Sequence, residues 1–295
     1  MGLEGRSLAI PARRVPSSVP SMGVNWTRPL TVDEMYGDWD YEAAVETLEQ
    51  SLEPRRSSVI FDTVASLGVG PDDHILDIGG RDGTHGLMMA ERFGCRVTVV
   101  DPASANLVDG EANVGEHESG HLVTLLPGVM EDIPAADDSF TVIFSRDMVT
   151  HVDDLITGFS ECARVLAPGG RMVIHANFQT DLMEPREAER LYNATAAVPR
   201  NADVGFFEDS LRSAGFTVSD LDVVGSEWYE ATQEAGISPN YLLQLSRLRR
   251  AEDRFVEAFG EVAYRSMYGN ALWGCYLLFG KLETRLYTLE GPAHT

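Results

Sequence analysis

Short apolar runs alternate with longer amphipathic stretches through the middle of the chain. The runs that predict buried strands are residues 74–78, 96–100, 121–126, 139–145, 171–176 and 216–224. Stretches with apolar residues at helical spacing separate most of them, and this alternation is typical of a parallel sheet with helices on both faces. Residues 284–289 alternate between apolar and polar positions, which predicts a seventh strand. We therefore expect an α/β fold with a doubly wound sheet.

Changes in this pattern divide the chain into five parts. Residues 1–30 are rich in proline and serine without apolar periodicity, which predicts a mobile tail. Residues 31–54 predict a helical arm, and residues 55–227 form the alternating core. Residues 228–283 have helical spacing instead of alternation, so we expect a helical insertion that covers the C-terminal edge of the sheet. Residues 284–295 are the last strand and the C-terminus.

The chain is strongly acidic, with 46 Asp and Glu against 23 Lys and Arg in 295 residues and a net charge of −23. Nucleic acids and anionic membranes attract basic faces, so we expect neither as a partner. The longest apolar run, residues 271–279, is too short to cross a bilayer. The cysteines have no metal-ligand or disulfide-framework spacing, and Cys95 and Cys162 are expected to be buried free thiols. We expect a cytoplasmic monomer or homodimer without a metal.

Residues 73–86 contain the strongest functional signal. An apolar run ends at Ile78, Gly79 and Gly80 follow at once, and a helical pattern starts near Thr84. A strand, a glycine turn and a helix in this order present backbone N–H groups to a ligand. The turn has neither the glycine spacing of a dinucleotide-binding loop nor the Gly-Lys-Ser/Thr of a Walker loop. These two classes of nucleotide site are therefore excluded.

Two acidic residues flank the turn. Asp77 lies at the end of the first predicted strand, and Asp101 ends the second, about where a ribose-hydroxyl acceptor lies in such folds. Their charges would repel a pyrophosphate. They suit a cationic ligand that carries a ribose.

Five motifs in order resemble the class I S-adenosylmethionine-dependent methyltransferases, over about residues 55–225. They are residues 76–83 (Leu-Asp-Ile-Gly-Gly-Arg-Asp-Gly), Asp101, residues 130–132 (Met-Glu-Asp), residues 138–143 (Asp-Ser-Phe-Thr-Val-Ile) and residues 164–170 (Arg-Val-Leu-Ala-Pro-Gly-Gly). The resemblance implies a seven-stranded Rossmann-like sheet, S-adenosylmethionine as cofactor and S-adenosylhomocysteine as product. The cofactor-binding residues that it implies are Asp77, Gly79, Gly80, Arg81, Gly83, Asp101, Pro102, Met130, Glu131, Asp132, Ser145 and Arg146. Arg81 departs from the family, which has a glycine there, and could hold the cofactor carboxylate.

The loop at residues 145–152, Ser-Arg-Asp-Met-Val-Thr-His-Val, is where the acceptor is expected to meet the cofactor. It resembles the loop of phosphoethanolamine, glycine/sarcosine and related small-molecule methyltransferases. If the acceptor is a hydroxyl or an acidic carbon, His151 suits the role of general base, and Asp147 could orient it or bind an acceptor amine. Alternatively, His151 caps the next helix or lines the pocket, and Asp147 is a cofactor or structural contact.

Other candidate residues have two interpretations each. Tyr36 and Trp39 could close over the site or simply pack. Trp228, Tyr229 and Trp273 could line an acceptor pocket or fill the core of the insertion. His85 is expected to touch the pocket only through another residue, and His175 is expected to be a satisfied histidine of the core or rim. The cluster Arg247, Arg249, Arg250 and Arg254 predicts a solvated helix face or an intersubunit contact.

We therefore expect methyl transfer from S-adenosylmethionine to a small organic acceptor in natural-product metabolism. Oxygen or carbon is slightly favoured over nitrogen as the acceptor atom, because a base is available. A methyltransferase-fold cyclase or isomerase that keeps the cofactor is the first alternative. A non-catalytic cofactor-binding protein is the second.

Overall fold

The computed structural model describes residues 25, 27–37, 39–237 and 239–292. The chain divides into two compact units, residues 1–52 and residues 53–295. Most of the predicted mobile tail, residues 1–30, lies outside the described residues.

The helices and strands are α1 (Val32–Met35), α2 (Tyr41–Leu48), α3 (Val59–Ser66), β1 (His74–Ile78), α4 (Thr84–Phe93), β2 (Arg96–Asp101), α5 (Ser104–Glu116), η1 (Glu118–Leu122), β3 (Val123–Pro127), β4 (Phe140–Arg146), η2 (Val149–His151), α6 (Leu155–Val165), β5 (Leu166–Gln179), α7 (Pro185–Thr195), η3 (Pro199–Ala202), α8 (Val204–Ser213), β6 (Thr217–Gly225), α9 (Glu227–Glu234), α10 (Tyr241–Arg250), α11 (Glu252–Phe259), α12 (Glu261–Leu278) and β7 (Leu282–Glu290).

The first unit contains α1 and α2, and both helices have side-chain caps. Thr31 forms a capping box with Glu34, and Asp40 caps the start of α2. Neither helix buries a residue, and Tyr36 and Trp39 are 77% and 50% exposed. The substrate roles of Tyr36 and Trp39 therefore stay predictions.

The second unit is built on a seven-stranded sheet with the order β3-β2-β1-β4-β5-β7-β6. All strands are parallel except β7, which runs antiparallel between β5 and β6. The strand order reverses between β1 and β4, which pair directly. The loops after these two strands diverge at the carboxyl edge of the sheet, and such a switch point is where ligands bind in this kind of fold.

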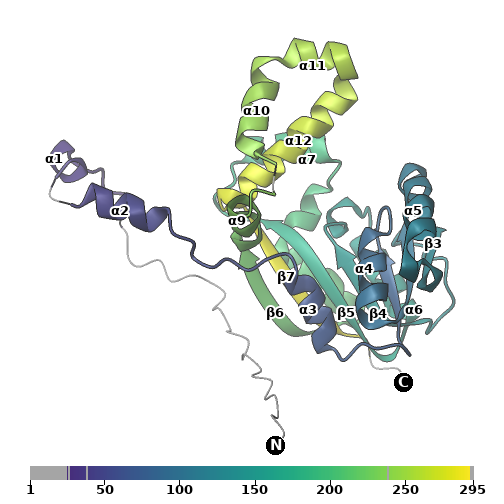
Figure 1. The fold of residues 1–295 in the computed structure, drawn as a ribbon. Coiled ribbons are helices and arrows are strands. Elements are labelled where there is room, and N and C mark those ends of the chain that lie inside the picture. The colour runs from purple at the N-terminus through teal and green to yellow at the C-terminus, as the bar shows by residue number, and fades with distance from the viewer. Residues whose placement is uncertain (1–24, 26, 38, 238, 293–295) are drawn as a thin grey trace, which may run out of the picture. The chain divides into compact units, whose positions relative to one another are not determined.

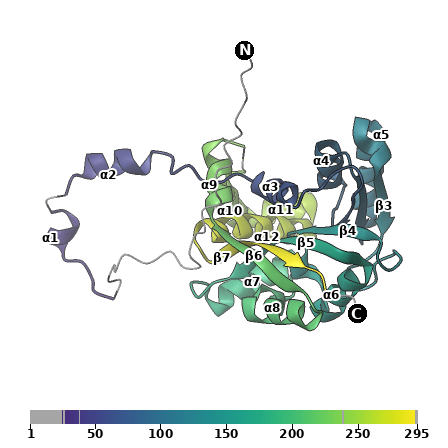
Figure 2. The same ribbon diagram turned by 90° about the horizontal axis from the view of Figure 1, so that it is seen from below.

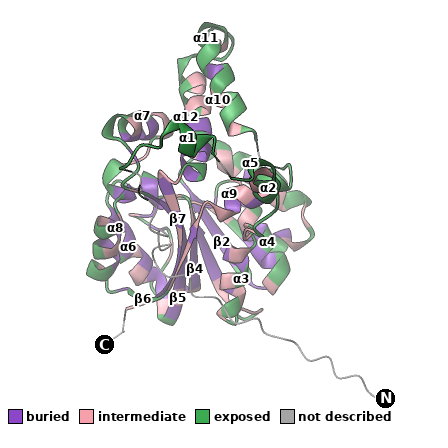
Figure 3. Ribbon diagram, turned by 90° about the vertical axis from the view of Figure 1, so that its left-hand side faces the viewer, coloured by how far each residue is buried: buried purple, intermediate pink, exposed green. Residues whose placement is uncertain are grey.

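Helices cover both faces of the sheet (Figures 1 and 2). On one face, α6 and α8 contribute Phe159 and Phe207 to the core, and on the other α3 and α4 contribute Phe61 and Met89. The strands between them are largely buried (Figure 3). This burial on both faces explains why their sequences are continuous apolar runs and do not alternate between apolar and polar residues.

Helices α9 to α12, here called the cap, are inserted between β6 and β7. Figure 1 shows them projecting beyond the sheet next to α7. A third core joins α12 to α7 and includes Leu191, Leu272 and Tyr276. A Cβ atom at Gly269 of α12 would lie 2.8 Å from the Ala194 carbonyl oxygen of α7. The cap is therefore fixed to the core by a close helix crossing.

The predicted α/β class, the doubly wound sheet and the helical insertion are confirmed. The strand predicted at residues 284–289 is antiparallel, because the chain leaves β6 and returns from the cap at the same edge of the sheet. α7 was not predicted, since most of its residues are polar and only three are buried. The predicted short helix around Trp273 is instead the end of the 18-residue α12.

Candidate active site

The turn after β1 lies against the loop that follows β4. Gly79 has a left-handed φ of 72°, and a Cβ atom there would lie 2.6 Å from Cβ of Met148. Arg81 also has a positive φ of 52°, and its backbone N–H donates to Oδ2 of Asp101 at 2.9 Å. Arg81 therefore adopts a conformation that glycine takes more readily, and the acid at the end of β2 fixes it there.

Asp77 lies beneath this turn. It is 1% exposed, and its Oδ2 has no hydrogen-bond partner among the described residues. Burial raises the pKa of Asp77 to about 7, while the positive charge of Arg146 opposes the rise. A Cβ atom at Gly80 would lie 2.6 Å from Oδ2 of Asp77, so the turn can pass over the carboxyl group only with glycine at this position.

Asp101 ends β2 with its carboxylate held by three donors. Oδ2 accepts from Arg81, and Oδ1 accepts from the Ala103 N–H at 2.9 Å and from Nδ2 of Asn106 at 3.0 Å. Each carboxylate oxygen can accept two hydrogen bonds, so Oδ2 retains capacity for a ligand hydroxyl. The carboxylate is thus held in one orientation with a free acceptor direction.

The third segment of the site follows β3. Met130 is 1% exposed, and Oε1 of Glu131 accepts from the backbone N–H groups of Asp153 and Asp154 at 2.9 and 3.2 Å. Glu131 therefore ties this segment to the start of α6. Asp132 is exposed and does not line the cavity described next, so the structure separates it from its two neighbours.

A cavity of about 530 Å³ lies between these loops. The predicted cofactor-binding residues that line it are Gly79, Arg81, Asp101, Pro102, Met130, Glu131 and Arg146. Asp77 lies under the turn, Gly80 is the residue of the turn that passes over its carboxyl group, and Gly83 is the N-cap of α4. Ser145 is fully buried in β4, and its Oγ has no hydrogen-bond partner in the part of the chain that the structure describes. Seven of the twelve predicted residues thus reach the cavity directly.

Asp147 follows β4 with a left-handed φ of 55°. Its Oδ1 accepts from Nδ2 of Asn177 at 2.6 Å and lies 3.0 Å from Nδ1 of His175. Desolvation opposes ionisation of Asp147, but His175 and Arg146 lower its pKa to about 2. Asp147 is therefore a carboxylate at neutral pH, and its side chain remains 40% exposed.

His151 ends the short helix η2 at the rim of the same cavity. Its Nδ1 lies 3.1 Å from the carbonyl oxygen of Ala196. A carbonyl only accepts hydrogen bonds, so Nδ1 is the donor in this contact and Nε2 takes no part in it. His151 is exposed and lines two cavities.

Two further cavities adjoin the first on the side of the cap. One of about 630 Å³ shares Arg81, Asp147, His151 and Asn270 with it and is also lined by Tyr229 and Trp273. The other, of about 210 Å³, is lined by Trp228, Tyr229 and Asp147 among others. All three predicted aromatic residues therefore border a cavity. Trp228 also packs in the core on one face of the sheet, whereas Tyr229 and Trp273 pack against the core between α7 and α12.

Arg146 connects the cavities to the residues behind them. Its guanidinium lies 4.4 Å from the centre of the Trp228 ring, and its Nη1 donates to Nε2 of His85 at 2.6 Å. Burial, with a contribution from the charge of Arg146, lowers the pKa of His85 to about 4, so this imidazole is neutral. His85 thus reaches the site only through Arg146, as expected.

His175 is the main residue that the sequence did not assign to the site. It is 3% exposed, as expected for a core histidine, but its Nε2 has no hydrogen-bond partner among the described residues. It also lines the 210 Å³ cavity. Its register partner in β4 is Arg146, and no signal in the sequence gives this register. Asn177 and Asn270 were missed for the same reason, because they come from a strand and a helix far along the chain.

Two other observations concern metals and thiols. Among the residues that the structure describes, no group of three or more His, Cys, Asp and Glu side chains could hold a metal ion. Cys95, Cys162 and Cys275 are buried free thiols, which confirms the prediction for the first two.

Comparisons with known proteins agree with this geometry. Residues 76–174 match the family described as Methyltransferase domain. Sarcosine/dimethylglycine N-methyltransferase of Halorhodospira halochloris is 28% identical over 188 residues, 62% of each chain. O-methyltransferase resE of Aspergillus sclerotiorum is 28% identical over 183 residues, 62% of this chain and 67% of that one. The alignment with the first of these relatives thus spans less than two thirds of its length.

Solved structures show the same fold. Geranyl diphosphate C-methyltransferase from Streptomyces coelicolor A3(2), in complex with Mg²⁺, geranyl diphosphate and S-adenosyl-L-homocysteine, has a TM-score of 0.61 and 17% identity, with 80% of this chain and 79% of that chain covered. The [4+2]-cyclase SpnF has a TM-score of 0.63 and 17% identity, with 80% and 82% covered. At this identity the likeness concerns the fold alone.

The fold is that of a methyltransferase domain, and residues 76–174 match that family. These findings support the resemblance of the sequence motifs to the class I S-adenosylmethionine-dependent methyltransferases, with S-adenosylmethionine as the cofactor and S-adenosylhomocysteine as its product.

The residues present fit this cofactor. The close approach at Gly79 leaves no room for a side chain beside the cavity, as a loop that touches a ligand with its backbone requires. Asp101 has a free acceptor direction for a ribose hydroxyl. Oδ2 of Asp77, which has no hydrogen-bond partner among the described residues, lies under the same turn. Within the described residues, no helix combines the length and the apolar content needed to cross a membrane.

Proposed function

We propose that this protein transfers a methyl group from S-adenosylmethionine to a small organic acceptor held under the cap. One observation carries the proposal. The 530 Å³ cavity next to the glycine turn shares Asp147, His151 and Asn270 with the 630 Å³ cavity next to the cap, so cofactor and acceptor would meet at these residues.

Each wall of the first cavity has a proposed role in holding the cofactor. Asp101 accepts hydrogen bonds from the ribose, while Pro102, Met130 and Glu131 border the adenine side. Gly79 and Arg81 border the methionine end, and the guanidinium of Arg81 offers a partner for the carboxylate. Asp77, Gly80, Gly83 and Ser145 shape the loops behind these contacts. Asp132, which is exposed, is assigned no direct contact.

S-adenosylmethionine supplies a methyl group that its sulfonium already activates. The remaining tasks of the protein are to align the acceptor, exclude water and accept a proton where the acceptor carries one. Nε2 of His151 is the base that we propose for a hydroxyl or an acidic carbon. Asp147 orients the acceptor from the shared wall, and Trp228, Tyr229 and Trp273 provide apolar contact area.

A partly aromatic acceptor space next to the cap suits a modest organic molecule, so we place the reaction in natural-product metabolism. The available base favours an oxygen or carbon acceptor over nitrogen. The two curated relatives differ on this point, since one is named as an N-methyltransferase and the other as an O-methyltransferase.

A cyclase or isomerase that retains the cofactor is the second candidate function. The similarity to the fold of SpnF supports it, because that protein is named as a [4+2]-cyclase. The cap would then shape a substrate for rearrangement, and His151 would have no proton to accept.

The test starts with isothermal titration of the purified chain with S-adenosylmethionine and S-adenosylhomocysteine, with NAD as control. Micromolar binding of the first two and none of NAD is expected. A panel of phenols, amines and activated methylenes is then incubated with cofactor labelled in its methyl group. Transfer of label to a small molecule supports methyl transfer. If the protein binds the cofactor and rearranges a substrate without transferring the label, the proposal of methyl transfer is overturned in favour of the cyclase.

A further inference from the structure

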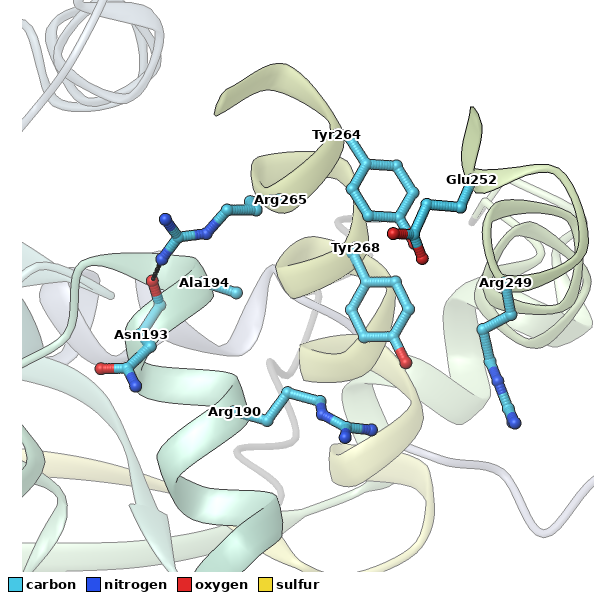
Figure 4. Close-up of a pocket in the computed structure, with 8 residues that line it drawn as sticks. All are labelled: Arg190, Asn193, Ala194, Arg249, Glu252, Tyr264, Arg265 and Tyr268. Carbon is cyan, nitrogen blue, oxygen red and sulfur yellow. Dashed lines mark hydrogen bonds between the residues drawn. The ribbon is translucent and has the colours of Figure 1, made fainter. Parts of the chain in front are cut away.

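A groove of about 450 Å³ lies in the cap region beyond the cavities described above, between α7, α10 and α12. Figure 4 shows three arginines on its walls: Arg190 from α7, Arg249 from α10 and Arg265 from α12. The chain has 46 acidic and only 23 basic residues. Three arginines around one groove therefore form a locally basic site on an acidic protein.

Two of these arginines are available for a ligand. Arg265 donates to the carbonyl oxygen of Asn193 at 2.9 Å, which Figure 4 shows as a dashed line. Among the described residues, neither Arg190 nor Arg249 forms an ion pair. The one acid that lines the groove, Glu252, offsets the charge of only one arginine, and Arg265 lies 3.9 Å from Oε1 of Glu261 outside the groove. The groove therefore retains a net positive charge.

The wall between the arginines is aromatic. Tyr264 and Tyr268 of α12 lie with their ring centres 6.0 Å apart. Figure 4 places the Tyr268 ring between Arg190 and the α10–α11 side of the groove. A carboxylate or phosphate group alone would fill only part of 450 Å³, so the space suits an acid with a flat or apolar body.

The groove adjoins the proposed acceptor cavity. Asn193, Ala194 and Arg265 line both the groove and the 630 Å³ cavity that contains Asp147 and His151. The close crossing of Gly269 over Ala194 fixes this shared wall. A molecule held by its acidic end in the groove can therefore extend toward the methyl donor.

We propose that Arg190 and Arg249 bind the carboxylate or phosphate group of the methyl acceptor, so that the acceptor is an organic acid or phosphate ester with a flat or apolar body. This inference rests on the proposed function, because it names the substrate class of that site. Guanidinium groups bind both oxyanions through charge-assisted hydrogen bonds, which Tyr268 can supplement with its hydroxyl.

The first experiment measures binding of phenyl phosphate, benzoate and neutral benzyl alcohol by calorimetry, at constant ionic strength and with saturating S-adenosylhomocysteine. Binding of at least one anion but not of the alcohol is expected, and the two anions distinguish a phosphate ester from a carboxylic acid. R249Q should weaken anion binding roughly tenfold or more, since it removes a charge-assisted hydrogen bond. R190Q/R249Q should abolish it.

R250Q is the matched control, because Arg250 is exposed on the same helix and does not line the groove. It should change anion binding less than twofold. Equal losses in R249Q and R250Q, or no binding of either anion, would overturn the proposal. Circular dichroism of each variant verifies its fold.

A kinetic arm separates this proposal from the proposed function. With any acceptor found active, the bound anion should inhibit competitively against the acceptor and not against S-adenosylmethionine. Non-competitive inhibition would overturn the assignment of the groove to the acceptor. If no methyl transfer occurs at all, the proposed function fails, whereas the binding arm still shows whether the groove takes an oxyanion.

Discussion

Nδ1 of His175 lies 3.0 Å from Oδ1 of Asp147, across the junction between β4 and β5. Asp147 donates its backbone N–H to the His175 carbonyl at 2.9 Å, so the two residues are joined by main chain and side chain. Thr284 of β7 completes the arrangement by donating to Oδ1 of Asn177, whose amide holds the same carboxylate oxygen. Three strands therefore fix one carboxylate at the wall shared by three cavities.

Replacement of Asp147 by Asn should reduce kcat at least tenfold while the affinity for S-adenosylhomocysteine changes less than threefold. The amide keeps the shape but removes the charge that orients the acceptor. Because the pKa of Asp147 is lowered to about 2, its own titration contributes nothing to the pH profile between pH 5 and 9. Steady-state kinetics measures kcat, and calorimetry measures the affinity for S-adenosylhomocysteine. An equal loss in kcat and in this affinity would contradict the role of Asp147 in orienting the acceptor.

Variants of His151 and His175 can show which of the two histidines acts as the base. His151→Gln should slow turnover of a hydroxyl or acidic-carbon acceptor, with cofactor affinity nearly intact. His175→Gln serves as the comparison, since His175 also lines a cavity. If only the second variant slows turnover, His175 rather than His151 is the base.

Asp101→Ala should weaken binding of S-adenosylmethionine by roughly ten- to a hundredfold. The variant removes the acceptor for the ribose hydroxyls and also releases the Arg81 N–H that shapes the turn. Asp132→Ala is the matched control, because this carboxyl group is exposed outside the cavity. Similar affinities for the two variants, measured by titration, would remove Asp101 from the cofactor site.

Asp77 should make the ligand-free protein less stable as the pH rises. Its pKa is about 7 in the folded state and near 3.8 when unfolded, so the folded state holds the proton more tightly. The free energy of unfolding therefore falls from about pH 4 to pH 7 by an amount on the order of a few kcal/mol. Asp77→Asn removes this dependence. Urea unfolding at pH 5 and pH 8 measures it, and identical pH dependence in both proteins would refute the assignment.

Phe207→Ala should destabilise the fold by about 3–5 kcal/mol, because the site cannot fully collapse around the missing ring. Phe207 is fully buried, and its ring lies 5.0 to 5.5 Å from those of Phe159, Phe178 and Tyr287. Val218→Ala, at a position 41% exposed, should cost far less. Denaturant unfolding compares the two.

The sequence predicted the strands and the cofactor loops because both depend on local patterns. Apolar runs and turn residues gave β1, β2 and β4 within a residue or two, and Gly79 and Asp101 follow directly from the ends of strands. These residues needed no knowledge of long-range register.

Residues whose roles depend on register were not predicted. His175 meets Asp147 only because β5 pairs with β4 in one particular register. Arg190 and Arg249 line one groove only because α7 packs beside the cap. Single apolar or charged positions on helices and strands do not encode such contacts. The antiparallel direction of β7 likewise follows from where the insertion enters and leaves the sheet.

The points where the chain enters and leaves the cap lie next to each other on the sheet. Gly225 at the end of β6 pairs with Thr284 near the start of β7, so the chain leaves for the cap and returns at adjacent points. A short hairpin could replace the cap without lengthening either strand, and a different cap could be spliced between the same two points. The connection itself thus permits exchange of the cap, but a replacement would have to cover Leu191 of α7, which packs in one core with Leu272 and Tyr276.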